Sequence, residues 1–128
     1  MPVRVLIADD VEVIRSVIRD LLAREPTLEV CGEAANFSQT FDLATSLKPD
    51  VILLDLQMPD GDRPKSDFVK LRLLSTQSRI LAMSLWHEDE ETQIIARGYG
   101  AVELLDKGKL FNELIPAIQR VSRKQSKP

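Results

Sequence analysis

The 128-residue sequence lacks several features that would place it in a specialised class of proteins. Its single cysteine, Cys31, cannot form an internal disulfide, which fits a reducing compartment. No apolar run approaches the roughly 18 residues that a membrane-spanning helix requires. The N-terminal "MPVRVLIADD" has no signal-peptide layout. Since internal repeats and low-complexity segments are also missing, we expect a single cytoplasmic domain without a membrane partner.

Two classes of ligand are disfavoured by what is missing. The formal net charge of −3 gives no sign of a basic face, so we expect no direct nucleic-acid binding by this domain. No glycine-rich loop follows the first apolar run, which argues against dinucleotide binding. What the sequence does contain is 44% hydrophobic and 29% charged residues, a balance typical of a chain that folds around a core.

Short apolar runs alternate with amphipathic stretches along the chain. Five runs rich in aliphatic residues predict strands at 3–8, 28–34, 51–55, 79–84 and 102–105. Apolar residues at helical spacing predict a helix after each strand: one carrying Ile14 to Leu22, one capped by Ser38, one opening at Ser66 or Asp67, one at 88–98 and one from 109 to about 122. Five strand–helix units in succession predict an α/β fold, a doubly wound parallel sheet with helices on both faces.

Proline and glycine set the expected helix ends. Pro26 and Pro49 should stop the first two helices, and Gly98 should end the fourth. Pro116 falls inside the fifth helix, where it removes a backbone hydrogen bond, so we predict a kink or an irregular start there. We place the domain at 1–122 and a basic tail, or the start of a linker, at 123–128.

Charged and polar side chains gather where the predicted strands end. The run "VILLDLQMPDG" (51–61) shows this most clearly, because four apolar residues lead directly into Asp55. A carboxylate beside a dry core is costly unless a partner compensates it. The carboxyl ends of parallel strands share one edge, where ligands bind in such sheets. That edge would therefore collect Asp9 and Asp10 from the first strand, Asp55 from the third, Ser84 from the fourth and Lys107 from the fifth, with Glu33 off to one side.

The chemistry of this set of groups is specific. Three neighbouring carboxylates repel one another, and a hard divalent cation such as Mg²⁺ would keep them ionised. Lys107 could neutralise a phosphoryl oxygen, Ser84 could donate to another, and an aspartate can itself be the nucleophile. Each residue alone has an ordinary structural interpretation, such as a helix cap, a turn or a solvated lysine. Their conjunction at one edge is what favours phosphoryl transfer.

These residues make the chain resemble a known family. The motifs "LIADD", "VILLDLQMPDG", "LAMS" and "AVELLDKG" are similar to those of the receiver domains of two-component response regulators, and the resemblance covers about residues 3 to 121. It implies a flavodoxin-like (βα)5 fold with the strand order 2-1-3-4-5. It also implies a signalling switch that assists its own phosphorylation and dephosphorylation, rather than an enzyme acting on other substrates.

The resemblance implies a role for each residue of the site. Asp55 would be the phosphoacceptor, taking a phosphoryl group from a phosphohistidine on a sensor histidine kinase or a phosphotransfer protein. The ligands of Mg²⁺ (or Mn²⁺) would be Asp10 directly, Asp9 through a water, Asp55, and the backbone carbonyl of Gln57. Ser84 and Lys107 would contact the phosphoryl group, and Ser84 would shift towards it. That shift would move the loop after the fourth strand and bias a two-state element.

Several positions depart from the family pattern. Leu85 stands where a small residue is usual, so we predict slow transfer from small phosphodonors. Leu104 replaces the usual aromatic switch residue, which suggests a different coupling to a partner surface. Gly61 and Pro64 make the loop after Asp55 atypical, and we expect it to be rearranged or mobile.

Alternatives to a phospho-accepting switch remain. One is a degenerate receiver that acts by binding alone, which the residues at 85 and 104 keep open. Another is a stand-alone phosphatase with an aspartyl nucleophile, although Gln57 stands where such enzymes usually carry a second aspartate. The sequence names neither the kinase nor the output. A downstream effector, a homodimer through the fourth or fifth helix, and an output domain in a longer natural chain all stay possible.

Overall fold

The computed structural model describes residues 1–59 and 77–124. Strands and helices alternate through them in the order β1 (Val3–Ala8), α1 (Glu12–Ala23), β2 (Leu28–Ala34), α2 (Phe37–Leu47), β3 (Val51–Asp55), β4 (Arg79–Ser84), α4 (Glu90–Gly98), β5 (Ala101–Asp106), the 3₁₀ turn η1 (Lys107–Lys109) and α5 (Leu110–Lys124). The predicted helix at Ser66 or Asp67 and the atypical loop with Gly61 and Pro64 lie outside the described residues.

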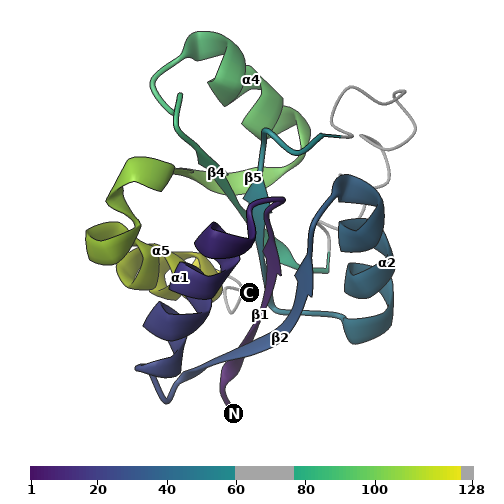
Figure 1. Ribbon diagram of the computed structural model, residues 1–128, viewed down its shortest axis with the longest axis vertical. Helices are drawn as coiled ribbons and strands as arrows, with labels where there is room; N and C mark the ends of the chain where they lie inside the picture. Colours follow the sequence, from purple (N-terminus) through teal and green to yellow (C-terminus); the bar gives the residue numbers. More distant parts are fainter. Residues whose placement is uncertain (60–76, 125–128) are drawn as a thin grey trace.

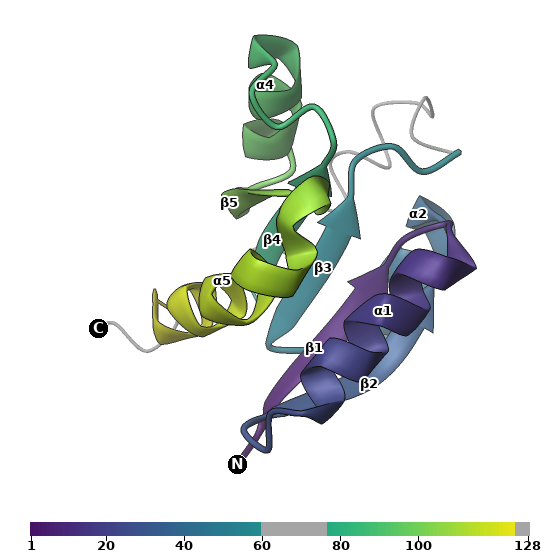
Figure 2. The ribbon, with the colours of Figure 1, turned by 60° about the vertical axis from the view of Figure 1, so that its left-hand side comes forward.

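The five strands form one parallel sheet in the order β2-β1-β3-β4-β5. This is the flavodoxin-like order that the family resemblance implied, so the predicted fold class is confirmed. Figure 1 shows β1 and β2 side by side, with α2 next to them. β3 lies at the centre of the sheet, between β1 and β4 (Figure 2). All five carboxyl ends therefore meet at one edge, the edge at which Asp55 ends β3.

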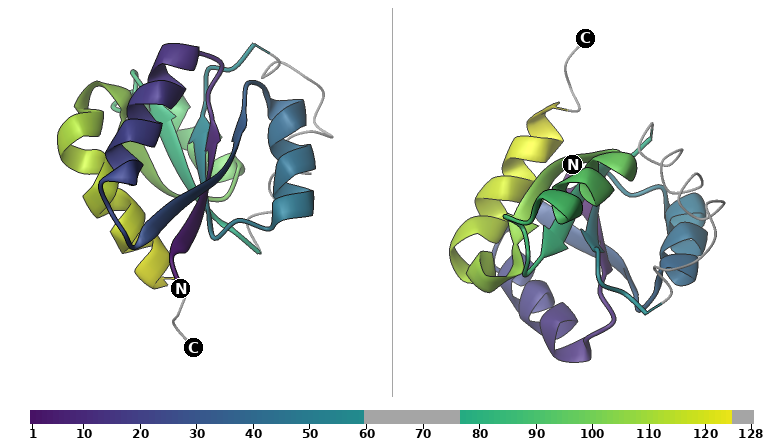
Figure 3. Two further views of the ribbon diagram at one scale, coloured as in Figure 1. Left: turned by 60° about the horizontal axis from the view of Figure 1, so that its bottom comes forward. Right: turned by 90° about the horizontal axis from the view of Figure 1, so that it is seen from above.

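Side chains of the central strands alternate between two apolar layers. Val51 and Leu53 of β3 face the layer formed with α1 and α5, whereas Ile52 and Leu54 face the layer formed with α2. Figure 3 shows α1 and α5 on one face of the sheet and α2 on the other. All four side chains are fully buried. Each such burial stabilises the fold by about 2 kcal/mol, which explains why this strand is apolar on both faces.

One of two helix ends differs from the prediction. The N-cap of α2 is Asn36, whose side chain accepts a hydrogen bond from the Gln39 amide at 2.8 Å, and Ser38 lies inside the helix. Gln39 reaches back to the Ala35 amide at 2.8 Å, so cap and third residue support each other. α4 ends at Gly98, as predicted, and the backbone turns left-handed two residues later, at Gly100 (φ 81°).

The start of the last helix is irregular, as Pro116 led us to predict. The 3₁₀ turn η1 precedes α5, and the Asp106 side chain caps that turn by accepting from the Gly108 amide at 2.9 Å. The helix then continues through Pro116 to Lys124, slightly beyond the predicted end. None of the helices in the described ranges combines the length and apolar character needed to cross a membrane.

Candidate functional site

The register of the sheet brings the predicted residues together. Ala8 of β1 pairs with Leu54 of β3, so the residues that follow them, Asp9 and Asp55, are neighbours across the sheet edge. On the other side Asp55 pairs with Met83, one residue before Ser84. The site is thus built from strand ends, which are rigid parts of the fold.

Asp9, Asp10 and Asp55 form what we call the acid cluster. Each contributes a carboxylate oxygen, and these three atoms lie within 4.8 Å of one another. Asp9 and Asp55 are buried, whereas Asp10 is exposed at the rim. Backbone amides hold the two buried carboxylates: Val11 donates to Asp9 Oδ1 and Gln57 donates to Asp55 Oδ1, both at 2.9 Å. Among the three aspartates of the cluster, Asp10 is therefore the one exposed to solvent.

Lys107 brings one positive charge to the acid cluster. Its Nζ lies 2.8 Å from Asp9 Oδ2 and 3.5 Å from Asp55 Oδ2, and its side chain is only 10% exposed. The 3₁₀ turn that begins at this residue directs it back over the sheet edge. One ammonium group therefore faces two buried carboxylates, and it lies closer to Asp9.

The unequal pairing leaves Asp55 undercompensated. Burial and the neighbouring charge of Asp9 raise the pKa of Asp55 to about 6, against the lowering effects of the Gln57 amide and Lys107. An aspartate raised to that degree is still mostly ionised at neutral pH. It therefore combines a reactive carboxylate with an unfavourable environment for its charge, a combination typical of functional sites.

The acid cluster fits a divalent cation. In the described part of the chain, the buried oxygen Asp9 Oδ2 accepts no hydrogen bond of regular geometry, although Lys107 Nζ lies close to it. The raised pKa of Asp55 likewise indicates that nearby positive charge does not fully offset the burial of its negative charge. Hard carboxylate oxygens are the donors that Mg²⁺ prefers. The three aspartates can therefore hold a metal ion, with Asp10 as the accessible member.

Ser84 is buried at the end of β4 and begins a tight turn. Its Oγ accepts a hydrogen bond from the Trp86 amide at 2.9 Å. Leu85 and Trp86 are each 59% exposed, so much of both side chains faces solvent. His87 then approaches Asp106, with Nδ1 at 3.7 Å from Oδ2, and its side chain is one-third exposed. The turn thus ties the β4–α4 loop to the end of β5.

Leu104, which stands at the position of the family's aromatic switch, lines an open hollow of about 280 Å³ between α4 and β5. His87, from the loop that carries the Ser84 turn, and Glu103 line the same hollow. Cys31 is partly buried against the layer that includes α2.

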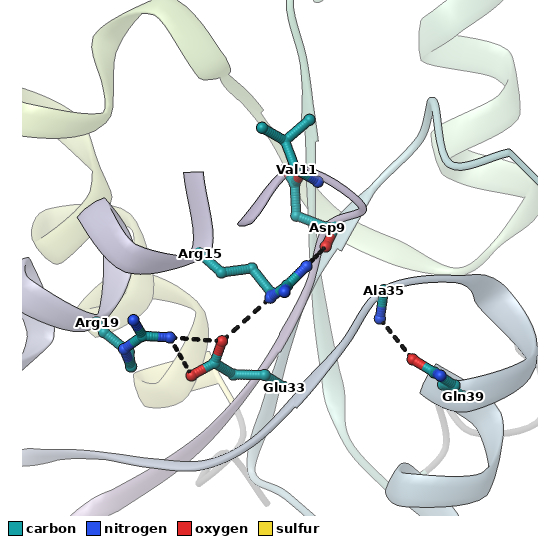
Figure 4. A network of polar contacts seen from close by, with 7 residues as sticks. All are labelled: Asp9, Val11, Arg15, Arg19, Glu33, Ala35 and Gln39. Carbon is teal, nitrogen blue, oxygen red and sulfur yellow. Dashed lines mark hydrogen bonds and ion pairs between the residues drawn. The ribbon is translucent and has the colours of Figure 1, made fainter. Parts of the chain in front are cut away.

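A second polar group, which the sequence did not reveal, lies beside the acid cluster. Glu33 accepts from Arg15 Nε at 3.1 Å and from Arg19 Nη1 at 2.8 and 2.7 Å (Figure 4). Arg15 also donates from Nη1 to the backbone carbonyl of Asp9 at 2.7 Å. We call these three side chains the arginine–glutamate network. The sequence shows that Arg15 and Arg19 are one helical turn apart, but their contacts with Glu33 depend on how α1 packs against β2.

Comparison with known proteins supports one family. The model of the response regulator receiver domain matches residues 5–119. The nitrate/nitrite response regulator NarL of Escherichia coli K12 is 38% identical over 106 residues, which are 82% of this chain and 49% of NarL. A protein-glutamate methylesterase/protein-glutamine glutaminase of Xanthomonas campestris is 36% identical over 85% of this chain and 30% of that protein. This chain thus spans half or less of these two relatives.

A solved structure has the same fold. The response regulator domain of Thermotoga maritima CheB superposes with a TM-score of 0.80, at 26% identity, and covers 100% of both chains.

Proposed function

This chain belongs to the response regulator receiver domain family, and on that premise we propose that Asp55 accepts a phosphoryl group from a phosphohistidine. The donor would be a sensor histidine kinase or a phosphotransfer protein. The acyl phosphate formed on Asp55 would then change how the chain binds its partner or output surface. Asp9, Asp10, Lys107 and Ser84 would support this transfer, each in a separate role.

In the transfer step, a carboxylate oxygen of Asp55 attacks phosphorus. The bond between phosphorus and the imidazole nitrogen breaks, and the imidazole leaves as a neutral histidine after taking up a proton. The position of Asp55 at the end of the central strand supports this role, because the Gln57 amide holds one carboxylate oxygen and fixes the direction of the other. Such positioning is most of what phosphoryl transfer requires of a protein.

Two further side chains would receive the phosphoryl oxygens. Lys107 lies within 3.5 Å of Asp55 and would neutralise one oxygen as a point charge. Ser84 Oγ already accepts from the Trp86 amide, which leaves its own hydrogen available to donate to another oxygen. A contact from Ser84 would therefore not require its present hydrogen bond to break. It would pull on the loop that carries Trp86 and His87.

Asp9, Asp10 and Asp55, with the Gln57 backbone carbonyl, are the residues that would hold Mg²⁺ or Mn²⁺. The bound cation would supply positive charge opposite the oxygens of the incoming phosphoryl group. Asp10 would offer the exposed ligand, whereas the buried Asp9 is already engaged by the Val11 amide and Lys107. This difference supports a more direct contact from Asp10 and a water-mediated one from Asp9.

The observation that carries the proposal is that one buried carboxylate, the candidate nucleophile Asp55, is surrounded by other charged side chains. Asp55 is 1% exposed, yet two further carboxylates and one ammonium group surround it. A turn that needed only a cap would not place three acids and a buried lysine at one point.

The proposal is tested by intact mass spectrometry after incubation with MgCl₂ and acetyl phosphate, or with a phosphorylated kinase. We expect one added phosphoryl group in the wild type and none in Asp55→Asn. The same reaction with EDTA in place of MgCl₂ should give no adduct.

Three results would contradict the proposal. The absence of an adduct with every donor would favour a receiver that acts by binding alone. An adduct that survives Asp55→Asn would move the acceptor to another residue. Continuous release of inorganic phosphate from many equivalents of a phosphoester would instead favour a stand-alone phosphatase.

A further inference from the structure

We infer that Arg15 is a positioning residue for the metal site, because it fixes the peptide that joins Asp9 to Asp10 while Glu33 balances its charge. This inference rests on the proposed function, since it concerns the site at which the cation would bind. Arg15 itself touches neither the carboxylates of the acid cluster nor a phosphoryl group. It would act through the backbone of two residues that do.

The contact is short, shielded and made from two elements. Arg15 lies on α1 and donates from Nη1 to the Asp9 carbonyl at 2.7 Å, with only 15% of its side chain exposed. Its Nε donates to Glu33 on β2 at 3.1 Å. Figure 4 shows the guanidinium held between that carboxylate and the Asp9 backbone. A planar guanidinium with both ends engaged has little freedom to move.

A fixed carbonyl determines where the next residue starts. The peptide group is planar, so holding the oxygen of Asp9 also sets the direction of the Asp10 amide and Cα. On the other side of Asp9, the carboxylate is held by the Val11 amide and Lys107. Asp10, by contrast, is exposed at the rim of the acid cluster. The Arg15 contact would therefore order Asp10, the aspartate of the acid cluster that lies at the rim.

Coulomb repulsion by itself disfavours an arginine beside a metal site. A guanidinium beside a cation site repels the cation, and its removal should tighten metal binding if Coulomb forces were all that mattered. Glu33 offsets that repulsion by pairing with Arg15, and Arg19 completes the pairing of the carboxylate from the side away from Asp9. The network still carries a net charge of +1, from two guanidinium groups and one carboxylate, but the second guanidinium is that of the more exposed Arg19, which does not contact Asp9. The two effects consequently predict opposite changes in Mg²⁺ affinity when Arg15 is removed. Loss of positioning should weaken binding, whereas loss of Coulomb repulsion should strengthen it.

The test is calorimetric titration of MgCl₂ into the wild type, Arg15→Met and Arg19→Ala. Methionine keeps the length of the apolar stem but removes the donors. Arg19→Ala is the matched control, because it removes a cation from the same glutamate without touching the Asp9 carbonyl. We expect the Mg²⁺ dissociation constant to rise roughly tenfold in Arg15→Met, as for other partners that orient metal ligands. It should stay within about twofold of the wild type in Arg19→Ala, since screening weakens an exposed charge.

The outcomes separate this inference from the proposed function. An unchanged or lower dissociation constant in folded Arg15→Met would overturn the positioning role while leaving the phosphoacceptor role intact. A wild type that neither binds Mg²⁺ nor forms the Asp55 adduct would instead overturn the proposed function.

Should Arg15→Met fail to fold, as judged by circular dichroism, Glu33→Gln carries the test. It leaves the guanidinium donors in place but removes the balancing charge. We expect a two- to threefold weaker Mg²⁺ affinity at low salt that recovers at high salt. No change at either salt concentration would contradict the charge-balancing role of Glu33.

Discussion

Two clusters of charged side chains lie at the same edge of the sheet, and they differ in how their charges are compensated. In the arginine–glutamate network, one carboxylate meets two guanidinium groups. In the acid cluster, three carboxylates meet one ammonium group. Pairing with Glu33 raises the pKa of Arg19, which means that its charge is favoured. Burial raises the pKa of Asp55, which means that its charge is disfavoured.

The difference indicates which cluster is built for a ligand. A carboxylate whose lone pairs are filled by arginine donors gains little from a further cation. A buried carboxylate that shares one lysine with its neighbour gains a great deal, because Coulomb interactions are strongest where water is excluded. The acid cluster is therefore held in an unsatisfied state by the fold, and the neighbouring network helps to hold it.

The largest effect is expected when the ammonium group of Lys107 is removed from the acid cluster. Lys107→Met should lower the rate of phosphoryl transfer to Asp55 by about 100-fold, since it removes a donor aimed at developing charge. It should also cost about 3 kcal/mol of unfolding free energy in EDTA, because the buried Asp9 loses its ion pair. The rate is measured by intact mass against time, and stability by urea unfolding.

The matched change in the other cluster is Arg19→Ala, which also removes a cation from a carboxylate. Arg19 is solvated and Glu33 keeps Arg15, so both the rate and the unfolding free energy should stay close to wild type. Equal losses in the two variants would show that the clusters do not differ as proposed.

The second effect is an increase in the unfolding free energy when Asp55→Asn removes the buried charge. Because the pKa of Asp55 is about 6 in the fold and near 4 in the unfolded chain, the native state binds more protons between these values. Its contribution to stability therefore falls as the pH rises from 4 through 6. Asp55→Asn should be more stable than wild type in EDTA, on the order of 1–3 kcal/mol at pH 7.5.

Thermal or urea unfolding at pH 5 and pH 7.5 measures the sign of this effect. The advantage of Asp55→Asn should shrink at pH 5, where the wild-type carboxylate is largely protonated. An advantage that grows as the pH falls, or a variant less stable than wild type at pH 7.5, would contradict the raised pKa. Glu33→Gln is the contrasting variant and should show no stabilisation at either pH.

A third and smaller effect is the response to metal. At ten times its dissociation constant, Mg²⁺ should raise the unfolding free energy of the wild type by about 1.4 kcal/mol at pH 7.5. Asp10→Asn and Asp55→Asn should each lose most of this gain, whereas Arg19→Ala should keep it. Equal stabilisation of all variants, measured by thermal unfolding with MgCl₂ and with a matched concentration of NaCl, would indicate a general salt effect instead.

The strands and the position of the acid cluster could be predicted from the sequence. The bounds of β1, β2, β3 and β4 follow from their apolar runs, because the hydrophobic pattern of a buried parallel strand is local. The sheet edge that gathers the five site residues then follows from topology alone.

Features that depend on side chains meeting across elements could not be predicted. The Arg15 contact to the Asp9 carbonyl requires the packing of α1 against the sheet, and the balance of Lys107 between Asp9 and Asp55 requires distances. Asn36 competed with Ser38 as a cap, and only the position of the first helical turn decides between them. The Asn-x-x-Gln pattern at 36–39 was the local signal that favoured the correct residue.

The smallest expected effect concerns access to Asp55 rather than its charge. Leu85 follows Ser84 directly in the turn closed by the Trp86 amide, and its side chain is 59% exposed. Leu85→Ala should speed transfer from acetyl phosphate a few-fold, equivalent to about 0.5–1 kcal/mol of barrier. Ile94→Ala is the control, since it removes a similarly exposed apolar side chain from α4. An unchanged rate in Leu85→Ala would mean that the loop leaves Asp55 accessible. A similar increase in both variants would mean that surface hydrophobicity, and not the residue beside Ser84, sets the rate.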